Sequence, residues 1–263
     1  MEQYDPDAVT RVERETWDGA ASIYVDTMAK LTSHALEILI ERAEIDGSSK
    51  ALEVACGPGH FTRMIADTGA TTFGVDLSPE MVIVASGLYP DIEFKEANAE
   101  NIPFDDETFD AVFINFAIHH FARPEKACGE IRRVLKPGAR FVFAGPIEQF
   151  GFGSFIDALS RFHTLEDLPH GPIYMGATGE DYENLIRESG FTDFDVNVLQ
   201  LDLVLDTFDQ VLETGWKMCG LNEVSKEIQE NIRAAAIENA KPYLKDGGYR
   251  FPDRVVVGVA RKS

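Results

Sequence analysis

A glycine-rich turn that follows a short apolar run is the feature of this sequence that most restricts its fold. Residues Ala51–Gly59 read A-L-E-V-A-C-G-P-G, and a second apolar run ends in G-V-D at Asp76. Glycine permits a tight turn and a close approach of the backbone to a ligand. A strand, such a turn and a second strand that ends on an acid are typical of a nucleotide-binding βαβ unit. Since the acid is placed to accept hydrogen bonds from ribose hydroxyls, the pattern predicts a ligand that carries an adenosine.

The residues around the turn discriminate between ligands that contain adenosine. A dinucleotide site requires a third glycine in G-x-G-x-x-G, but Thr62 stands at that position after Gly57 and Gly59. The carboxylate of Glu53, just before the turn, would repel a pyrophosphate and attract an ammonium group. S-adenosylmethionine carries an ammonium group and a sulfonium but no phosphate. Glu53 and Asp76 together therefore favour S-adenosylmethionine over NAD.

Three later segments occur in an order that resembles a known family. They read E-A-N-A-E-N-I-P-F (Glu96–Phe104), F-D-A-V-F-I-N-F-A-I-H-H-F (Phe109–Phe121) and E-I-R-R-V-L-K-P-G-A-R-F-V-F (Glu130–Phe143). Over about Lys50–Pro146 the chain resembles the class I S-adenosylmethionine-dependent methyltransferases. More narrowly, it is similar to the methyltransferase type 11 group, which includes ubiquinone and menaquinone biosynthesis methyltransferases. The resemblance implies an adenine-contacting turn, a fourth strand with its loop, and a helix, turn and fifth strand.

The alternation of strand and helix signals predicts an α/β fold. We expect a doubly wound, mostly parallel, seven-stranded sheet that is Rossmann-like and carries helical lid insertions. The expected strands are Ala51–Ala55, Thr71–Asp76, Ile92–Glu96, Phe109–Asn115, Ala139–Gly145, about Asp195–Leu201, and Arg254–Ala260. The expected helices between the strands are Phe61–Asp67, Pro79–Gly87, Pro124–Leu135 and Gly179–Ser189. Outside this core we expect Arg11–Ile45 to be helical and Asp206–Tyr243 to form two helices. The resemblance implies that the last strand runs antiparallel to its neighbours.

We expect one methyltransferase domain over residues 1–263. Its core comprises about 46–146, 178–201 and 251–263, and its lid comprises about 11–45, 147–177 and 202–250. In doubly wound folds, ligands bind beyond the carboxyl ends of the strands. The lid segments attach near that edge, so we expect them to cover the substrate site.

The resemblance also implies a set of residues that bind the cofactor. They are Tyr24, Glu53, Ala55, Cys56, Gly57, Gly59, Asp76, Leu77, Met81, Asn98, Ala99, Glu100 and Asn115. Two of them depart from the family pattern, because Ala55 and Asn98 stand where glycine and aspartate are usual. Trp17, Tyr24 and Met28 lie on one expected helix, where an aromatic face suits a sulfonium by cation–π attraction. Packing in the core is the alternative role for these three side chains.

His119 and His120 are the candidates for catalysis. They follow the fourth strand, near where the methyl group of the cofactor is expected to point. Histidine accepts a proton near neutral pH, so either residue is a candidate base, and a structural role for the pair is the alternative. His163 and His170 in the expected lid either face the substrate or are solvated loop histidines.

The rest of the expected lid is aromatic and acidic. Its aromatic residues favour an apolar or aromatic substrate, although the same side chains are needed to pack the lid on the core. They are Phe150, Phe152, Phe155, Phe162 and Tyr174. Glu148, Asp157, Glu166 and Asp167 either hold a substrate cation or are solvated, as acids usually are in so acidic a chain.

Composition excludes several kinds of partner. The net charge is −21 and the pI about 4.6, which argues against nucleic acid and anionic membrane surfaces. Cys56, Cys128 and Cys219 show no C-x-x-C spacing, so we expect neither a disulfide framework nor a metal site, and we expect Cys56 to pack in the turn. The acidic N-terminal residues do not resemble a signal peptide, and no apolar run is long enough to span a membrane. We therefore expect a cytoplasmic protein.

The leading hypothesis is an S-adenosylmethionine-dependent methyltransferase that acts on a small, apolar or aromatic molecule at O, C or N. One alternative is a catalytically silent protein that binds S-adenosylmethionine and regulates a partner. The other is an NAD-dependent oxidoreductase, which Thr62 and Glu53 disfavour. The sequence leaves the acceptor atom and the oligomeric state open.

Overall fold

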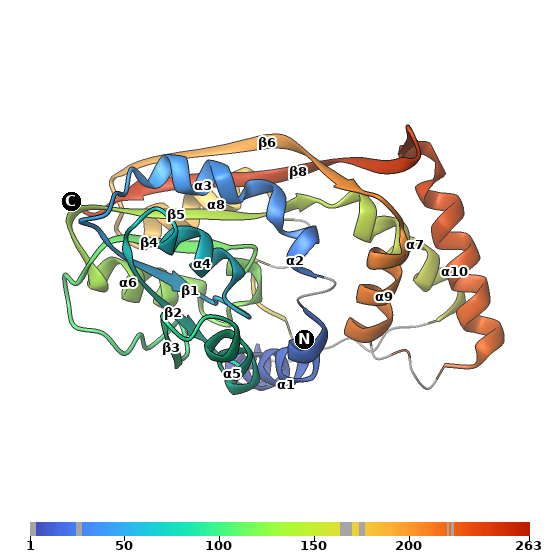
Figure 1. The fold of residues 1–263 in the computed structure, drawn as a ribbon, viewed down its shortest axis with the longest axis horizontal. Coiled ribbons are helices and arrows are strands. Elements are labelled where there is room, and N and C mark those ends of the chain that lie inside the picture. Colours follow the sequence, from blue (N-terminus) through green and yellow to red (C-terminus); the bar gives the residue numbers. More distant parts are fainter. Residues whose placement is uncertain (1–3, 25–27, 164–169, 174–176, 220, 222–223) are drawn as a thin grey trace.

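A β-sheet with helices on both faces runs through the length of the molecule (Figure 1). The computed structural model describes residues 4–24, 28–163, 170–173, 177–219, 221 and 224–263. Within this part of the chain the sheet has eight strands in the order β3-β2-β1-β4-β5-β8-β6, and β7 pairs with β8. The strands are β1 (Lys50–Val54), β2 (Thr71–Asp76), β3 (Glu93–Glu96), β4 (Phe109–Asn115), β5 (Leu135–Glu148), β6 (Asp193–Leu205), β7 (Leu244–Lys245) and β8 (Gly248–Arg261).

Most helices connect consecutive strands, as a doubly wound fold requires. The α-helices are α1 (Pro6–Tyr24), α2 (Met28–Leu31), α3 (Leu36–Ala43), α4 (His60–Ala66), α5 (Pro79–Leu88), α6 (Pro124–Val134), α7 (Phe150–Phe162), α8 (Gly179–Glu188), α9 (Asp209–Met218) and α10 (Lys226–Ala240). Short 3-10 turns are η1 (Ser33–Ala35), η2 (Ile118–His120) and η4 (Lys241–Tyr243). None of the helices in the described residues is long and apolar enough to cross a bilayer.

The observed topology confirms the expected fold class. Strands β1 to β5 pair in parallel, whereas β8 is antiparallel to both β5 and β6. The strands β5, β6 and β8 are longer than predicted, and β7 and α7 were not predicted as elements. The added length of β6 and β8 pairs residues 202–205 with residues 249–252, beyond the expected ends of both strands.

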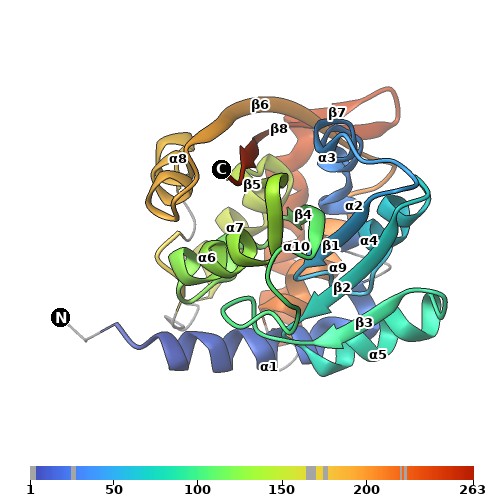
Figure 2. The same ribbon diagram turned by 90° about the vertical axis from the view of Figure 1, so that its left-hand side faces the viewer.

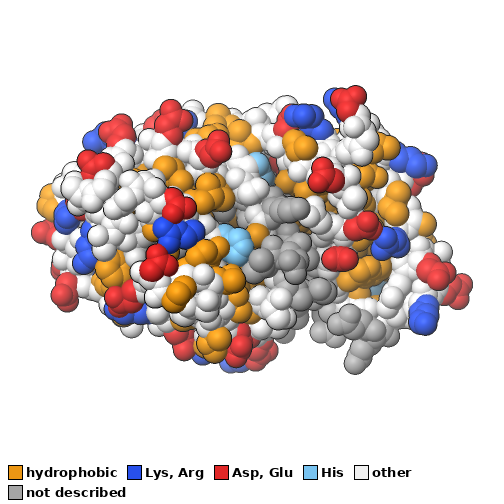
Figure 3. Space-filling model, in the orientation of Figure 1, with side chains coloured by type: hydrophobic (Ala, Val, Ile, Leu, Met, Phe, Trp, Pro, Cys, Tyr) orange, Lys and Arg blue, Asp and Glu red, His pale blue; other side chains and the backbone are white. Residues whose placement is uncertain are grey.

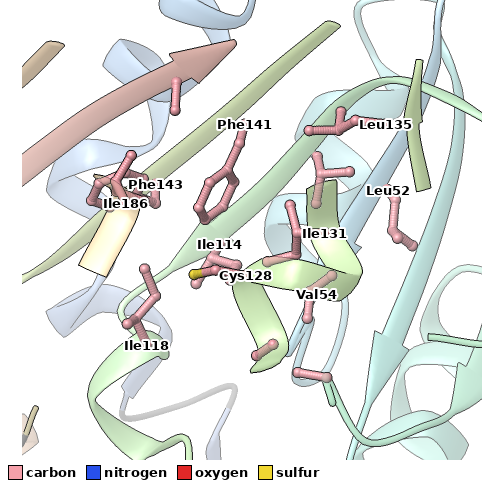
Figure 4. Packing of buried hydrophobic residues seen from close by; sticks show 14 of the residues in the cluster. Leu52, Val54, Ile114, Ile118, Cys128, Ile131, Leu135, Phe141, Phe143 and Ile186 are labelled. Carbon is pink, nitrogen blue, oxygen red and sulfur yellow. The ribbon is translucent and has the colours of Figure 1, made fainter. Parts of the chain in front are cut away.

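The core consists of two apolar layers, one on each face of the sheet, and Figure 2 shows the helices that cover the two faces. Side chains alternate between the two faces of a strand. In β4, Val112 and Ile114 belong to the layer under α6 and α8, whereas Ala111 and Phe113 belong to the layer under α3 and α4. Figure 4 shows the first layer, in which Cys128 of α6 packs among aliphatic and aromatic side chains. Burial on both faces fixes the register of β4, because a slip of one residue would move the side chains of each apolar layer to the opposite face of the sheet.

The outer ends of β6 and β8 carry a second group of helices, which we call the distal lobe (α7, α9 and α10) (Figure 1). This lobe has its own apolar cluster, which includes Phe155 of α7, Leu212 of α9, Ile232 of α10 and Phe251 of β8. Leu31 of α2 joins the same cluster, so part of the N-terminal segment packs on the lobe. Helix α1 instead lies along α5 beneath the core (Figures 1 and 2).

A matched pair of glycine substitutions tests the packing of the distal lobe. A Cβ on Gly215 of α9 would lie 2.3 Å from the ring of Phe155, whereas a Cβ on Gly129 of α6 has nothing within 4 Å. We expect Gly215→Ala to lower the free energy of unfolding by about 1–3 kcal/mol through overpacking. Gly129→Ala should raise it by about 0.5–1 kcal/mol, because alanine favours the helix. Urea denaturation measures both, and equal stabilisation by the two substitutions would contradict the packing described here.

Candidate functional site

A cavity of about 800 Å³ lies beyond the carboxyl ends of the parallel strands. Its core side is formed by Ala55 and Gly57 after β1, Asp76 at the end of β2, Asn98 after β3 and Asn115 at the end of β4. Helix α1 and the distal lobe supply the other walls. The strands place these residues together because the carboxyl ends of parallel strands meet at one edge of the sheet.

Asp76 joins the turns after β1 and β2. Its Oδ2 accepts a hydrogen bond from the Gly57 amide at 2.7 Å, and its Oδ1 accepts one from the Ser78 amide at 2.9 Å. Burial raises the pKa of Asp76 to about 6, so the carboxylate is ionised at neutral pH. Because each carboxylate oxygen has two acceptor sites, capacity remains for a ligand in the cavity.

The glycine-rich turn has the backbone conformation that its sequence suggests. Gly57 and Gly59 have φ values of 52° and 83°, and Ala55 has φ of 57°. The alanine therefore occupies the left-handed region, where its methyl group makes this conformation less favourable. The departure noted in the sequence thus leaves the turn geometry intact.

Aromatic side chains of α1 cover the turn. The ring of Tyr24 lies 3.9 Å from the position of a Cβ on Gly57, and its centroid is 5.9 Å from that of Trp17. Burial raises the pKa of the Tyr24 phenol to about 12. Both rings line the cavity. Met28, predicted to lie on the same helix, instead begins α2, because α1 ends at Tyr24, and its side chain is outside the described side chains.

Three of the predicted cofactor residues lie behind the cavity wall. Glu53 faces α4, where its Oε2 accepts a 2.5 Å hydrogen bond from Thr62 Oγ1. Glu53, Cys56 and Gly59 are not among the lining residues. Alternation along β1 gives the reason, because Glu53 shares its face with Ala51, which packs against the α4 layer. This placement does not support the expected direct contact between Glu53 and a ligand ammonium group. It also explains Thr62, which holds the Glu53 carboxyl.

The remaining predicted cofactor residues line the cavity. These are Tyr24, Ala55, Gly57, Asp76, Leu77, Met81, Asn98, Ala99, Glu100 and Asn115. Asn98 Oδ1 accepts from the Glu100 amide at 2.8 Å, and the Glu100 carboxylate pairs with Arg123 at 3.0 Å. Asn115 Nδ2 donates to the Thr32 carbonyl at 3.1 Å, while Asn115 Oδ1 is buried with no partner among the described residues.

The two candidate histidines differ in their surroundings. His119 is half-buried, its Nδ1 is buried with no partner in the described structure, and burial lowers its pKa well below the usual value. His120 Nδ1 lies 3.1 Å from the carboxylate of Glu13, whose Oε2 accepts from Trp17 Nε1 at 2.9 Å. Sequence reasoning missed Glu13. An acid on an amphipathic helix gives no signal of its own, since solvated acids are common in this chain.

The distal side of the cavity is apolar with acidic side chains interspersed. It includes Leu31, Phe150, Phe152, Leu203, Pro242 and Tyr243, together with Glu148, Asp157, Glu238 and Asp253. Asp253 caps α7 by accepting from the Phe150 amide at 2.8 Å, and burial raises its pKa to about 7. No lysine or arginine belongs to the lining within the described ranges.

Other residues singled out from the sequence lie elsewhere. His163 does not line the cavity, and His170 is exposed on the loop at Gly171. Phe155 packs inside the distal lobe, and Phe162 is exposed. Glu166, Asp167 and Tyr174 lie outside the described residues. Across the part of the chain that is described, no cluster of His, Cys, Asp or Glu is arranged to hold a metal.

One face of the molecule carries mixed charge (Figure 3). On the face shown in Figure 3, the described lysine and arginine side chains are scattered among aspartate and glutamate rather than gathered in one patch. Histidine side chains reach the surface near the centre of this face.

Known proteins resemble the chain in sequence and in fold. A family model described as "Methyltransferase domain" matches residues 52–143. The ubiquinone/menaquinone biosynthesis C-methyltransferase UbiE of Enterobacter sp. is 33% identical over 61% of this chain and 68% of its own length. The O-methyltransferase resE of Aspergillus sclerotiorum is 27% identical over 89% of this chain and 85% of its own.

A crystal structure of the YcgJ protein of Bacillus subtilis has a TM-score of 0.61 at 20% identity, covering 88% of this chain and 98% of that one. At this identity the likeness shows the fold alone. The chain spans between 41% and 50% of the length of four further curated relatives.

The buried Glu53 makes stability depend on pH. Burial raises the pKa of Glu53 to about 8 from 4.5, so the folded state holds a proton that the unfolded chain releases. The free energy of unfolding should therefore fall between pH 6 and pH 8.5, on the order of 1 kcal/mol or more. Glu53→Gln, which is neutral at every pH, should flatten this dependence. Urea denaturation across this range measures it, with exposed Glu80→Gln as the control that keeps the wild-type slope. An unchanged slope in Glu53→Gln would show that Glu53 is already ionised.

Proposed function

Because the chain belongs to the class I S-adenosylmethionine-dependent methyltransferases, we propose that it transfers the methyl group of S-adenosylmethionine to a small molecule. The observation that carries the proposal is Asp76, held at the cavity wall by the amides of Gly57 and Ser78. This arrangement presents a carboxylate for ribose hydroxyls directly beside the glycine-rich turn.

The residues around the cavity fit this cofactor. Leu77 and Met81 give an apolar surface for a purine, and Asn98 to Glu100 form the turn beside it. The unpartnered Asn115 Oδ1 offers an acceptor to a donor on the ligand. Tyr24 and Trp17 supply aromatic faces suited to a sulfonium. A pyrophosphate is disfavoured, because the described wall offers carboxylates at Asp76 and Glu100 but no lysine or arginine.

When bound, S-adenosylmethionine supplies a methyl group made electrophilic by the attached sulfonium, so the cofactor carries the difficult chemistry. The protein has to align the acceptor and exclude water, and alignment alone contributes up to about 7–11 kcal/mol in ideal cases. Helix α1 and the distal lobe both contribute side chains to the wall of the cavity. His119 or His120 is the candidate base for an acceptor that arrives protonated.

The acceptor side of the cavity supports a small apolar or aromatic substrate. Phe150, Phe152, Leu203 and Tyr243 line it. The absence of lysine and arginine from the described lining disfavours acceptors that carry a phosphate or carboxylate. The relatives named for quinone biosynthesis and for O-methylation also support a small-molecule acceptor. The net charge of −21 argues against a nucleic acid as the methyl acceptor. We also propose that the protein is cytoplasmic.

Cofactor binding and turnover test the proposal together. We expect calorimetry to detect S-adenosylmethionine and S-adenosylhomocysteine, with micromolar affinity, and not NAD. A panel of phenols, amines, thiols and quinols, followed by mass spectrometry, should reveal an acceptor that gains a methyl group. Tight binding of NAD alone would end the proposal in favour of an oxidoreductase. Binding of the adenosyl compounds without turnover on any acceptor would favour the catalytically silent regulator.

Asp76 should matter for affinity. Asp76→Ala removes the acceptor for the ribose hydroxyls and the link between the two turns, so we expect cofactor binding to weaken by roughly 1.5–3 kcal/mol. Asp76→Asn, which keeps one acceptor oxygen, should lose less. Exposed Asp105→Ala serves as the charge-matched control and should bind like the wild type. Calorimetric affinities equal to wild type in a folded Asp76→Ala protein would remove the carboxylate from the ribose site.

A further inference from the structure

A carboxylate–imidazole pair connects α1 to the loop after β4. Glu13 of α1 and Nδ1 of His120 in η2 are 3.1 Å apart, although 107 residues separate them in sequence. Their side chains are only 12% and 21% exposed. Trp17 Nε1 donates to the same carboxylate at 2.9 Å, and the Trp17 ring meets the His120 ring edge to face at 5.1 Å. All three side chains line the cavity.

This pairing fixes which nitrogen of His120 is free. A carboxylate is an acceptor only, so Nδ1 has to carry the proton in the hydrogen bond. Neutral imidazole then has its lone pair on Nε2. No described residue hydrogen-bonds Nε2 of His120. The pair therefore presents a nitrogen with a free lone pair at a wall of the cavity, while the Glu13 carboxylate holds the ring through Nδ1.

The neighbouring histidine lacks these properties. His119 has no carboxylate partner among the described residues, and burial disfavours a positive charge on its ring. The two rings lie 4.0 Å apart, so a charge on either one disfavours a charge on the other. The titratable side chains in contact with His120 are thus Glu13 and His119, while Asp76 and Glu100 line the same cavity.

We propose that His120 is the base of the methyl transfer, that Glu13 is its positioning residue, and that the acceptor is a hydroxyl or amine that arrives with its proton. This inference rests on the proposed function. The proton of the acceptor O–H or N–H passes to Nε2 of His120, and the electron pair of that bond stays on the heteroatom. The heteroatom forms the new bond to the methyl carbon, while the electron pair of the broken carbon–sulfur bond remains on sulfur.

The pairing of His120 with Glu13 requires that helix α1 covers the cavity. The helix is held to the core by Asp18, which accepts from Ser78 Oγ at 2.5 Å, and by Asp7, which pairs with Arg123 at 2.8 Å. Glu13 lies between these two anchors on the same helix. The proton acceptor is therefore complete only where α1 covers the cofactor site.

The first test needs no cofactor. Nitrogen-15 NMR of histidine-labelled protein reports the tautomer of neutral His120. In the wild type we expect the Nδ1-protonated form to dominate. Glu13→Gln should weaken this preference, whereas Glu15→Gln, an equal loss of charge on an exposed position of α1, should leave it unchanged. A dominant Nε2-protonated form in the wild type overturns the proposal. If Glu13→Gln does not fold, Trp17→Phe replaces it. This substitution removes the other hydrogen-bond partner of the Glu13 carboxylate, so we expect a small decrease in the fraction of the Nδ1-protonated form.

The second test measures turnover on substituted phenols of increasing acidity. His120→Ala should lose about 10²-fold or more on weakly acidic phenols, and the loss should shrink for phenols that are already ionised. Glu13→Gln should lose part of this factor, Glu13→Asp should recover some of it, and Glu15→Gln should lose nothing. The affinity for S-adenosylhomocysteine should stay within about twofold in all four variants.

The outcomes separate this inference from the proposed function. Wild-type protein that methylates no acceptor overturns the proposed function, and the role of His120 falls with it. Active protein in which His120→Ala and Glu13→Gln both keep full turnover overturns only the base and leaves the methyltransferase standing. If His120→Ala loses the same factor of turnover on every phenol, the role of His120 as base is also overturned, because such a loss would reflect altered structure rather than proton transfer.

Discussion

The hydrogen bonds of Asp76 are the interaction on which the site depends. Its carboxylate accepts hydrogen bonds from the amides of Gly57 and Ser78. The turns after β1 and β2 are therefore fixed relative to each other before any ligand binds. Ser78 then caps α5 by accepting from the Met81 amide and donates to Asp18 of α1. A single buried acid thus orders the turn, the helix beneath it and the helix that covers it. Such preorganisation lowers the entropy lost when a ligand binds.

The second constraint is the length of β6 and β8. Their antiparallel pairing runs from Asp193 to Leu205, well beyond the parallel strands. The extended ribbon carries α7, α9 and α10, whose apolar faces form a cluster separate from the two core layers. This second cluster supports the side chains that line the acceptor side of the cavity. The cavity therefore lies between two independently packed bodies of side chains, with α1 closing a third side.

The acidic side chains around the cavity have different roles, and the hydrogen-bond partners of each one determine its role. Glu53 is held by Thr62 away from the cavity, where burial raises its pKa to about 8. Asp76, which accepts two backbone amides, has a pKa of about 6 and is charged at neutral pH. Glu13 is engaged by Trp17 and His120 at the cavity wall. In a chain with so many acids, only the partner of each one distinguishes a structural carboxyl from a functional one.

Patterns in the sequence predict the succession of core strands and helices, the glycine-rich turn, the acid at the end of β2 and the family. Each of these is local, because turn geometry and apolar alternation are set by neighbouring residues. Three features follow instead from how distant segments pack together. They are the full length of β6 and β8, the position of Glu53 behind the cavity wall, and the pairing of Glu13 with His120. The face that Glu53 occupies follows from the burial of β1 on both sides. The contact between Glu13 and His120 joins segments 107 residues apart, and no local propensity specifies which distant side chain a helix will meet when it packs.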